Sequence, residues 1–393
     1  MTTNIELQIV YWSCVTVVAY IYAGYPLLTW MRARRRTETP CDTIKVHAES
    51  TMKADRQVSI VIVAHNEAHS LPRKIDSLLT SLDADRIREI LIGSDGSTDD
   101  TCSVLRARGD SRLRLFDFPV RRGKPSVLNE LVPQCQSDIV VLADARQIFD
   151  QHCITRLLAH FQNDSVGVVS GELVLRSEAA QTTAAAGIGF YWRYEKFIRR
   201  CESRGRGVPG ATGACYAIRK SLFRPIPPTT ILDDVVIPMQ AVARGYRCLF
   251  EPEALVFDIP SSSTRQEAIR KRRTIAGVAQ LIRLFPQWLL PWRNPLWLEY
   301  MSHKMLRLGS PLLMALTMAT NICLLELPIY RVLLIVQLAF YASALVGWCY
   351  QLAGRGSRLF GPSLMFVTLN LTTAVALWDA LFANYRVTWQ KTA

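Results

Sequence analysis

Long apolar segments at both ends of the chain restrict its fold more than any other feature. Residues 9–31 carry no charged side chain, and a helix of about 20 apolar residues spans a bilayer. Glu6 precedes this segment and the basic run Arg32 to Arg36 follows it. By the positive-inside rule, the N-terminus is expected outside and residue 32 in the cytoplasm. A cleaved signal peptide would instead have a basic start and a shorter apolar core.

The C-terminal third predicts three further membrane spans, at Leu308–Leu327, Val332–Leu352 and Leu364–Ala383. The preceding segment, residues 284–307, is rich in Trp, Pro and basic residues, which suits an amphipathic stretch lying in the membrane interface. The predicted organisation is therefore a membrane helix with a basic flank (1–36), a linker (37–54), a soluble domain (55–283), an interfacial segment (284–307) and about three membrane helices (308–393).

The net charge of +13 admits nucleic acid, an anionic membrane surface or a phosphorylated substrate as partners. The basic residues gather beside the apolar segments and near Lys124, without interleaved aromatic platforms in the soluble part. This distribution disfavours nucleic acid. The ten Cys show no CxxC spacing, which favours reduced thiols over a disulfide framework or a zinc site.

The soluble part alternates strand and helix patterns. Apolar, β-branched runs of strand length include "QVSIVIVAH", "REILIG", "RLRLFDFP" and "DIVVLADA", and helical spacing lies between them. Uniformly apolar strands alternating with helices predict a mainly parallel α/β sheet that is covered on both faces.

Ligands bind beyond the carboxyl ends of the strands in such sheets, and four polar sets fall there. They are His65-Asn66-Glu67, the Ser94–Ser97 turn with Asp95, the basic loop at Lys124, and Asp144. An Asp at such a place can accept hydrogen bonds from a ribose or a base amide, and cations before a helix suit a diphosphate. The chain has no GxGxxG and no GxxxxGK[ST], so dinucleotide and P-loop binding are not favoured.

Two more features follow in the second half of this domain. The small residues around Gly213 allow a close approach of backbone to a ligand. Asp233 and Asp234 precede an amphipathic helix, where adjacent acids either satisfy the helix dipole or supply a general base.

Taken in order, these motifs resemble the family 2 glycosyltransferases. The matching features are a Glu after the first strand, "DGSTDDT", "GK…LN", an Asp ending a later strand, "GATGACYAIR", an acidic pair before a helix, and a basic segment before membrane spans. The resemblance is greatest to the membrane-integrated branch with poly-N-acetylglucosamine, cellulose and hyaluronan synthases. It implies a GT-A fold, a nucleotide-sugar donor, inversion at the anomeric carbon, and Mg²⁺ or Mn²⁺.

The resemblance also implies roles for individual residues. His65, Asn66, Glu67 and Asp95 would hold the donor's nucleoside, with Lys124 and Arg273 at its diphosphate. Asp144 would match the first acid of the DxD motif and hold the metal. Asp234 would be the catalytic base, with Asp233 before it. Gly213, Arg270 and Thr274 would lie on the acceptor and phosphate side.

Two positions depart from the family pattern. Arg146 stands where the second DxD acid is expected. Mg²⁺ often binds through one or two carboxylates plus phosphates and water, so Asp144 alone can suffice. We expect Arg146 not to bind metal, leaving it to face the diphosphate or to pair with an acid. Thr274 replaces the Trp of QxxRW and cannot stack on an acceptor sugar, so processive and single transfer both stay open.

The sequence therefore predicts an inverting transferase that moves a sugar from a UDP-sugar to a polysaccharide or lipid-linked acceptor. It is expected to work at the cytoplasmic face of the inner membrane. The alternative is a non-catalytic membrane subunit with a degenerate site. The joint presence of Asp95, Lys124, Asp144, Asp234 and Arg273 argues against this alternative. Whether a partner subunit takes part stays open.

Overall fold

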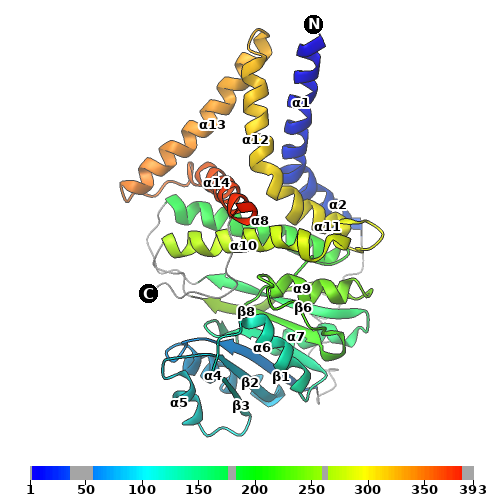
Figure 1. The fold of residues 1–393 in the computed structure, drawn as a ribbon, viewed down its shortest axis with the longest axis vertical. Helices are drawn as coiled ribbons and strands as arrows, with labels where there is room; N and C mark the ends of the chain where they lie inside the picture. Colours follow the sequence, from blue (N-terminus) through cyan, green and yellow to red (C-terminus); the bar gives the residue numbers. More distant parts are fainter. Residues whose placement is uncertain (1, 36–55, 176–182, 259–263, 383–393) are drawn as a thin grey trace.

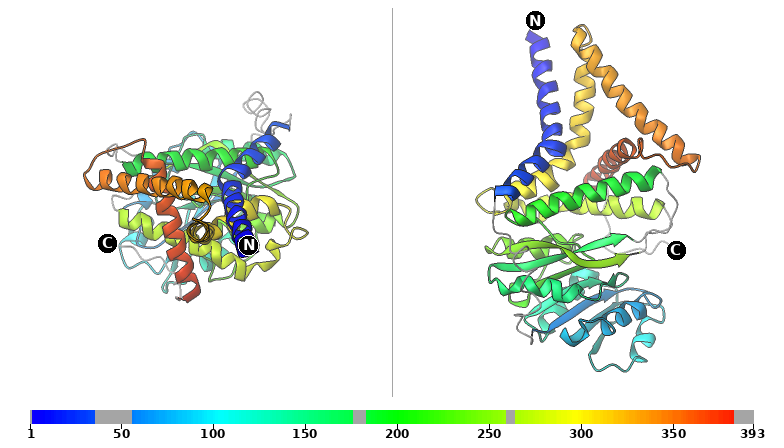
Figure 2. Two further views of the ribbon diagram at one scale, coloured as in Figure 1. Left: turned by 90° about the horizontal axis from the view of Figure 1, so that it is seen from above. Right: turned by 180° about the vertical axis from the view of Figure 1, so that it is seen from behind.

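The computed structural model describes residues 2–35, 56–175, 183–258 and 264–382, so the predicted linker at 37–54 lies outside the described residues. An α/β domain forms one end of the molecule, and long helices project from the other end (Figure 1). Two further helices, α8 (Thr183–Arg204) and α10 (Thr264–Leu284), lie between the sheet and the projecting helices (Figures 1 and 2).

The α/β domain is built on one eight-stranded sheet, in the order β3-β2-β1-β4-β7-β6-β8-β5. The first four strands of this order pair in parallel, whereas β7 is antiparallel to both of its neighbours and β5 is antiparallel to β8. The predicted mainly parallel α/β fold is confirmed. The strands are β1 (Val58–Ala64), β2 (Ile87–Asp95), β3 (Leu113–Phe118), β4 (Ile139–Asp144), β5 (Ile148–Phe149), β6 (Val166–Leu175), β7 (Cys215–Arg219) and β8 (Arg247–Asp258).

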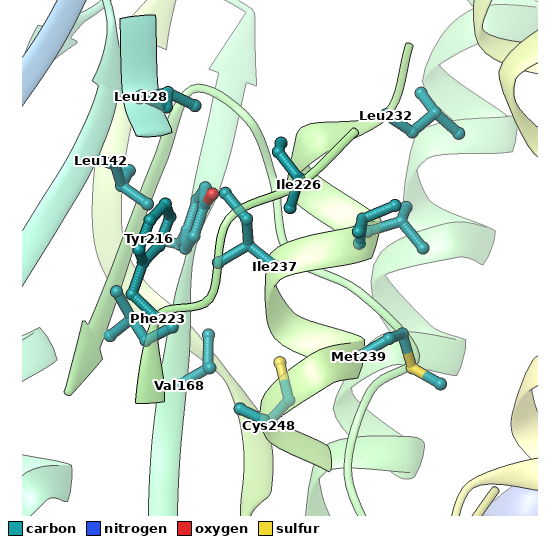
Figure 3. Packing of buried hydrophobic residues seen from close by; sticks show 14 of the residues in the cluster. Leu128, Leu142, Val168, Tyr216, Phe223, Ile226, Leu232, Ile237, Met239 and Cys248 are labelled. Carbon is teal, nitrogen blue, oxygen red and sulfur yellow. The ribbon is translucent and has the colours of Figure 1, made fainter. Parts of the chain in front are cut away.

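Helices cover both faces of the sheet because its strands are apolar on both sides. On β1, Val58, Ile60 and Ile62 pack with α4 (Leu71–Leu79), α5 (Thr101–Arg106) and α7 (Cys153–Ala159). Val61 of the same strand belongs to the opposite core, which contains α6 (Lys124–Leu131) and α9 (Asp233–Val242). Figure 3 shows this second core, with Ile237 of α9 beside Val168 and Tyr216 of the sheet, and Met239 on the side of α9 turned away from them. The strands are thus held rigidly at the edge where the polar loops begin.

Three helices in the described part of the chain are long and apolar enough to cross a membrane: Asn4–Arg35, Pro328–Leu352 and Gly361–Ala380. The first consists of α1 (Thr2–Ala19), a π-helical turn η1 (Tyr20–Gly24) and α2 (Tyr25–Arg35). The others correspond to α13 (Pro328–Leu352) and α14 (Gly361–Phe382). Residues 308–327, predicted as a fourth span, contain most of α12 (Leu306–Cys323), which is not among these three.

The segment predicted to be interfacial folds as short turns: η6 (Pro286–Leu289), α11 (Trp297–Tyr300) and η7 (Met301–Met305). Its tryptophans differ in environment. Trp288 is buried and stacks on Phe285, with ring centroids 4.2 Å apart, whereas the side chain of Trp292 is exposed. One part of this segment therefore packs on the α/β domain, and another part faces outward.

Candidate functional site

The carboxyl ends of β1, β2 and β4 meet at one edge of the sheet, as their parallel pairing requires. Val63 of β1 lies opposite Gly93 of β2 and Asp144 of β4, and Ala64 lies opposite Ser94. The loops that leave these strands are thereby placed side by side. Four of the polar sets predicted from the sequence begin here or in the adjoining loop at Lys124.

The residues after β1 connect this loop to the loop after β2. The His65 Nδ1 atom lies 2.8 Å from the Asp95 carbonyl oxygen. Asn66, which has a positive φ of 55°, accepts a hydrogen bond from the Thr98 amide, and its own amide donates to the Ser97 hydroxyl. Asn66 tolerates this left-handed conformation better than most residues. Both residues therefore join the loop after β1 to the loop after β2.

Asp95 fixes the basic loop. Its carboxylate is buried and accepts hydrogen bonds from the backbone amides of Arg122 (2.6 Å) and Gly123 (2.9 Å). Gly96 adopts a φ of 63°, and a Cβ there would lie 2.7 Å from the Arg121 nitrogen, so only glycine fits. A small pocket lies between these loops and is lined in part by His65, Asp95 and Lys124.

Lys124 joins two of the predicted acids. Its Nζ atom lies 2.9 Å from Asp144 Oδ1 and 3.0 Å from Asp233 Oδ2. Burial lowers the pKa of Lys124, but its attraction to Asp144 and then to Asp233 outweighs this and raises the pKa above its ordinary value. A permanently charged ammonium therefore lies between the end of β4 and the start of α9.

Asp234 begins α9 beside this ion pair. Gly213 donates its backbone amide to Asp234 Oδ2 at 3.1 Å, and a Cβ on Gly213 would lie 3.2 Å from the same oxygen. Burial, followed by repulsion from Asp233, raises the pKa of Asp234 to about 6, although Lys124 and Lys304 act in the opposite direction. A carboxylate with such a pKa is ionised at neutral pH and is still basic enough to accept a proton.

Arg199 of α8 supports the Gly213 loop and was not singled out from the sequence. Its guanidinium donates to the Thr212 hydroxyl (2.6 Å) and to the Ser170 hydroxyl (2.9 Å), and it lies over the Phe250 ring. Ser170 in turn accepts the Thr212 amide. No motif marks Arg199, because it lies in a helix with several other basic residues and only the fold selects it.

Arg146, the residue in place of the second DxD acid, pairs with Glu67. The Arg146 Nε atom lies 2.8 Å from Glu67 Oε1, and the Glu67 side chain is only 9% exposed. Of the two arrangements left open by the sequence, the structure has the pairing with an acid. Glu67, predicted to contact the nucleoside, pairs with Arg146, and its backbone amide donates to the Thr101 hydroxyl.

The residues in the QxxRW position lie on α10, apart from these strand ends. Thr274 and Arg270 are both exposed, and the Thr274 hydroxyl donates to the Arg270 carbonyl of its own helix. Arg273 lies on the same helix. α10 contacts the segment before the acids at Gly277, where a Cβ would lie 2.6 Å from Leu232, the residue before Asp233.

A metal would need ligands from the donor as well as from the protein. The described residues hold no group of three or more His, Cys, Asp or Glu side chains that could bind a metal ion. Asp144 nevertheless ends its strand with its side chain 29% exposed, and Asp233 Oδ2 lies close by, 3.0 Å from the same Lys124 Nζ that contacts Asp144. One or two carboxylates plus phosphate oxygens form a typical Mg²⁺ site, so these residues fit such an ion.

The sheet order and the acids at its carboxyl edge define the protein as a GT-A type α/β domain joined to candidate membrane helices. A solved structure with this fold over 96% of the chain is the mannosyltransferase PcManGT from Pyrobaculum calidifontis, in complex with GDP-Man and Mn²⁺. The two share 21% sequence identity with a TM-score of 0.68, and the match covers all of that chain. At this identity, the likeness establishes the fold.

Residues 59–226 match the family "Glycosyl transferase family 2", so the chain contains a domain of that family, as predicted. It is also similar to the poly-beta-1,6-N-acetyl-D-glucosamine synthases of Staphylococcus aureus and Staphylococcus epidermidis, at 24% identity in each case. The first match covers 61% of this chain and 59% of the relative, and the second covers 50% and 48%. The matched region therefore spans only about half to three fifths of these relatives.

Proposed function

We propose that this protein is an inverting, membrane-bound glycosyltransferase that moves a sugar from a UDP-sugar to a glycan or lipid-linked acceptor. The observation that carries the proposal is the arrangement of Asp234 beside Lys124, with Lys124 held between Asp144 and Asp233. This arrangement supports the proposal because ligands of such sheets bind at the carboxyl edge, where Asp234 could act as a base and Lys124 is a partly buried cation.

The chain's own groups suit a single displacement. The carboxylate of Asp234 takes the proton from an acceptor hydroxyl, whose oxygen forms a bond to the anomeric carbon of the donor sugar. The bond from that carbon to the diphosphate oxygen breaks, and UDP leaves with the electron pair. Lys124, once turned toward the donor, would lie near the departing diphosphate, where a cation stabilises the developing negative charge and lowers the barrier.

A divalent metal held by Asp144, with Asp233 near it, would supply further positive charge to the diphosphate. Lys124 pairs with both carboxylates in this structure. Donor binding would then require Lys124 to turn from the acids toward the phosphates. A flexible four-carbon side chain makes this movement easy.

The membrane arrangement supports an acceptor that is reached from the bilayer. Asp379 of α14 forms an ion pair with Arg272 of α10, two residues from Arg270 and Thr274. A membrane helix is thus tied directly to the helix in the QxxRW position. We place the catalytic domain on the cytoplasmic face of the inner membrane, where nucleotide sugars are found, and the basic end of α2 supports this orientation.

The test is a donor screen on the full chain in detergent. UDP release and sugar transfer would be measured for several UDP-sugars, with and without Mn²⁺, in the presence of glycan and lipid-linked acceptors. Asp234→Asn is expected to lower kcat by about 10²- to 10⁴-fold while leaving the Kd for the donor unchanged. Asp164→Asn is a matched control, because the Asp164 side chain is 98% exposed.

Turnover at the normal rate by Asp234→Asn would refute the assignment of the base. A wild-type chain that binds UDP-sugar but releases no UDP with any acceptor would instead favour a non-catalytic subunit. The length of the product separates the two modes of synthesis. We expect short products, because Thr274 offers no aromatic surface to a growing sugar chain.

A further inference from the structure

A second cavity lies away from the acids. Its volume is about 460 Å³, and its wall combines Arg206 of the turn after α8, the turn between α9 and β8, and the segment from η6 to the start of α11. Its lining includes Arg206, Tyr246, Arg247, Asn294, Leu296 and Trp297. Asp233 and Asp234 start α9, whereas the cavity lies at its other end, so a ten-residue helix of about 15 Å separates the two places.

This cavity lies at the level where the apolar helices end. Trp297 and Leu298 of its wall precede Glu299, whose carboxylate is 3.8 Å from Arg32 of α2. Arg32 begins the basic end of the candidate span Asn4–Arg35. Figure 1 shows α2 and α11 at the junction between the projecting helices and the sheet domain. Basic residues that flank a span lie at the height of the lipid headgroups.

The chemistry of the wall favours an anion. Two arginines line the cavity, and no Asp or Glu does. In the described part of the chain, Arg206 forms no ion pair, and its guanidinium lies 3.4 Å from the Pro295 carbonyl. Arg247 donates to the Ser203 carbonyl at 3.2 Å, which fixes its guanidinium against the wall. Paired guanidinium groups suit phosphate because each presents several donors in one plane.

The rest of the wall is preformed and largely apolar. The Asn294 amide is engaged on both sides, since it donates to the Trp288 carbonyl and accepts the Leu296 amide. The Trp297 indole donates to the Leu289 carbonyl at 2.8 Å, so its ring is held in place. These polar groups are used within the protein. Beside the arginines, most of the side chains that line the cavity are apolar, and a free inorganic ion would not need them.

We propose that this cavity binds the headgroup of an anionic phospholipid. Arg206 and Arg247 hold the phosphate, and Leu296 and the Trp297 ring contact the glycerol and the first methylenes. A zwitterionic headgroup brings a cation of its own, which the two arginines repel. The exposed Trp292 lies next to the lining residue Pro291 and inserts among the surrounding lipids. The site is separate from the proposed catalytic centre and does not depend on it.

Native mass spectrometry of the full chain in neutral detergent tests this site. Phosphatidylglycerol or phosphatidylcholine would be titrated into wild type, into the cavity variant Arg206→Gln/Arg247→Gln, and into the control Arg244→Gln/Arg293→Gln. The control removes the same charge from two exposed arginines that do not line the cavity. Phosphatidylglycerol should bind wild type and control at least about tenfold more tightly than phosphatidylcholine, and the cavity variant should lose about tenfold.

Equal losses in the cavity and control variants would mean that surface charge alone attracts the lipid, and the proposal would fail. It would also fail if inorganic phosphate bound the lipid-free protein as tightly as phosphatidylglycerol does. Thermal unfolding shows whether each variant is folded. Arg206→Gln alone, at an exposed position, is expected to lose at least about threefold in affinity, so the site can be judged even if the double variant unfolds.

Discussion

The environment of Asp234 determines how kcat/KM should depend on pH in the acidic range. Burial and the charge of Asp233 raise the pKa of Asp234 to about 6. Because a general base must be ionised, kcat/KM should fall about tenfold per pH unit below that value. Measured rates of UDP release between pH 4.5 and 8 check this. A profile that stays flat down to pH 4.5 would show that Asp234 is not the base.

The same raised pKa has a consequence for stability. The folded chain binds more protons at Asp234 than the unfolded chain does between the ordinary carboxyl pKa and about pH 6. The contribution of this group to stability therefore decreases as the pH rises through that window. Asp234→Asn should have a higher Tm than wild type at pH 8, and the difference should disappear near pH 4. Asp164→Asn, at an exposed carboxylate, should show no such trend.

Arg146 should not affect the metal requirement, because its guanidinium is paired with Glu67. Arg146→Ala should leave the dependence of transfer on Mn²⁺ concentration unchanged and lower the stability by about 1 kcal/mol, since the Arg146 side chain is 41% exposed. Asp144→Ala should abolish the stimulation by Mn²⁺. If Mn²⁺ stimulated Asp144→Ala as it does wild type, Asp144 would have only a structural role at the end of its strand.

For individual residues, the sequence identified the acids and Lys124 as candidate site residues but did not show which groups they contact. The strand pattern placed Asp95, Lys124 and Asp144 at one sheet edge, and it placed Asp233 and Asp234 at the start of a helix. The Arg146–Glu67 pair joins residues 79 positions apart, and Asp95 turned out to bind backbone amides. Which of several nearby groups an ionic side chain contacts depends on distances of a few ångströms. Local spacing along the chain does not contain this information.

Among the helices, α10 supports the start of α9 and thereby Asp233 and Asp234, the proposed catalytic acids. Gln280 accepts the Ile231 amide and donates to the Thr229 carbonyl. Gly277 lets the two elements touch, since a Cβ there would lie 2.6 Å from Leu232 Cγ. A change at one turn of α10 should therefore move the start of α9. In the sequence, Gly277 follows the basic residues at 270–273, but this pattern gives no reason why the position needs a residue without a side chain.

Gly277→Ala should lower kcat about tenfold or more and leave the donor Kd unchanged, because displacing the reacting groups by about 1 Å weakens catalysis strongly. Steady-state kinetics and donor titration of the detergent-purified chain check this. Gly309→Ala is the matched control, as a Cβ at Gly309 meets nothing within 4 Å. Equal kinetics of the two variants would mean that α10 does not position α9.

Element types were predictable, but the pairing direction of some strands was not. The four apolar runs singled out from the sequence became β1 to β4, and the acidic pair begins α9. β7 pairs antiparallel with β4 and β6, and β5 is only two residues long. Direction depends on how a connection crosses the sheet, and apolar patterning is the same in parallel and antiparallel central strands.

Over the whole molecule, some helices that the sequence led us to expect as apolar membrane spans are joined to one another by polar side chains. α12 contains buried Ser310, Thr320 and Asn321. The Ser310 hydroxyl donates to Asn370 of α14 and lies 3.0 Å from the Tyr22 hydroxyl. Hydropathy along one segment does not register such contacts, because they satisfy polar groups only after the helices assemble. The sequence therefore predicted where the helices lie along the chain, but not the polar contacts that they make with one another.

The direction of the helices gives a test of the membrane orientation. α13 has 25 residues and is about 38 Å long, more than the roughly 30 Å of a bilayer core. Its N-terminal end points away from the sheet domain, and its C-terminal end returns toward it (Figures 1 and 2). The residues before and after α13 should therefore lie on opposite sides of the membrane, and the basic loop at 353–358 should share the side of the sheet domain.

Cysteines introduced at the exposed positions Glu326 and Arg358 would report these sides. A membrane-impermeant maleimide should label Glu326→Cys in intact spheroplasts, whereas Arg358→Cys should react only after permeabilisation. Wild type is the control for the native thiols, since Cys323 and Cys349 are exposed as well. The reverse pattern would place the acids of the sheet edge outside the cytoplasm, away from nucleotide sugars. Labelling of both positions in intact spheroplasts would mean that α13 does not cross the bilayer.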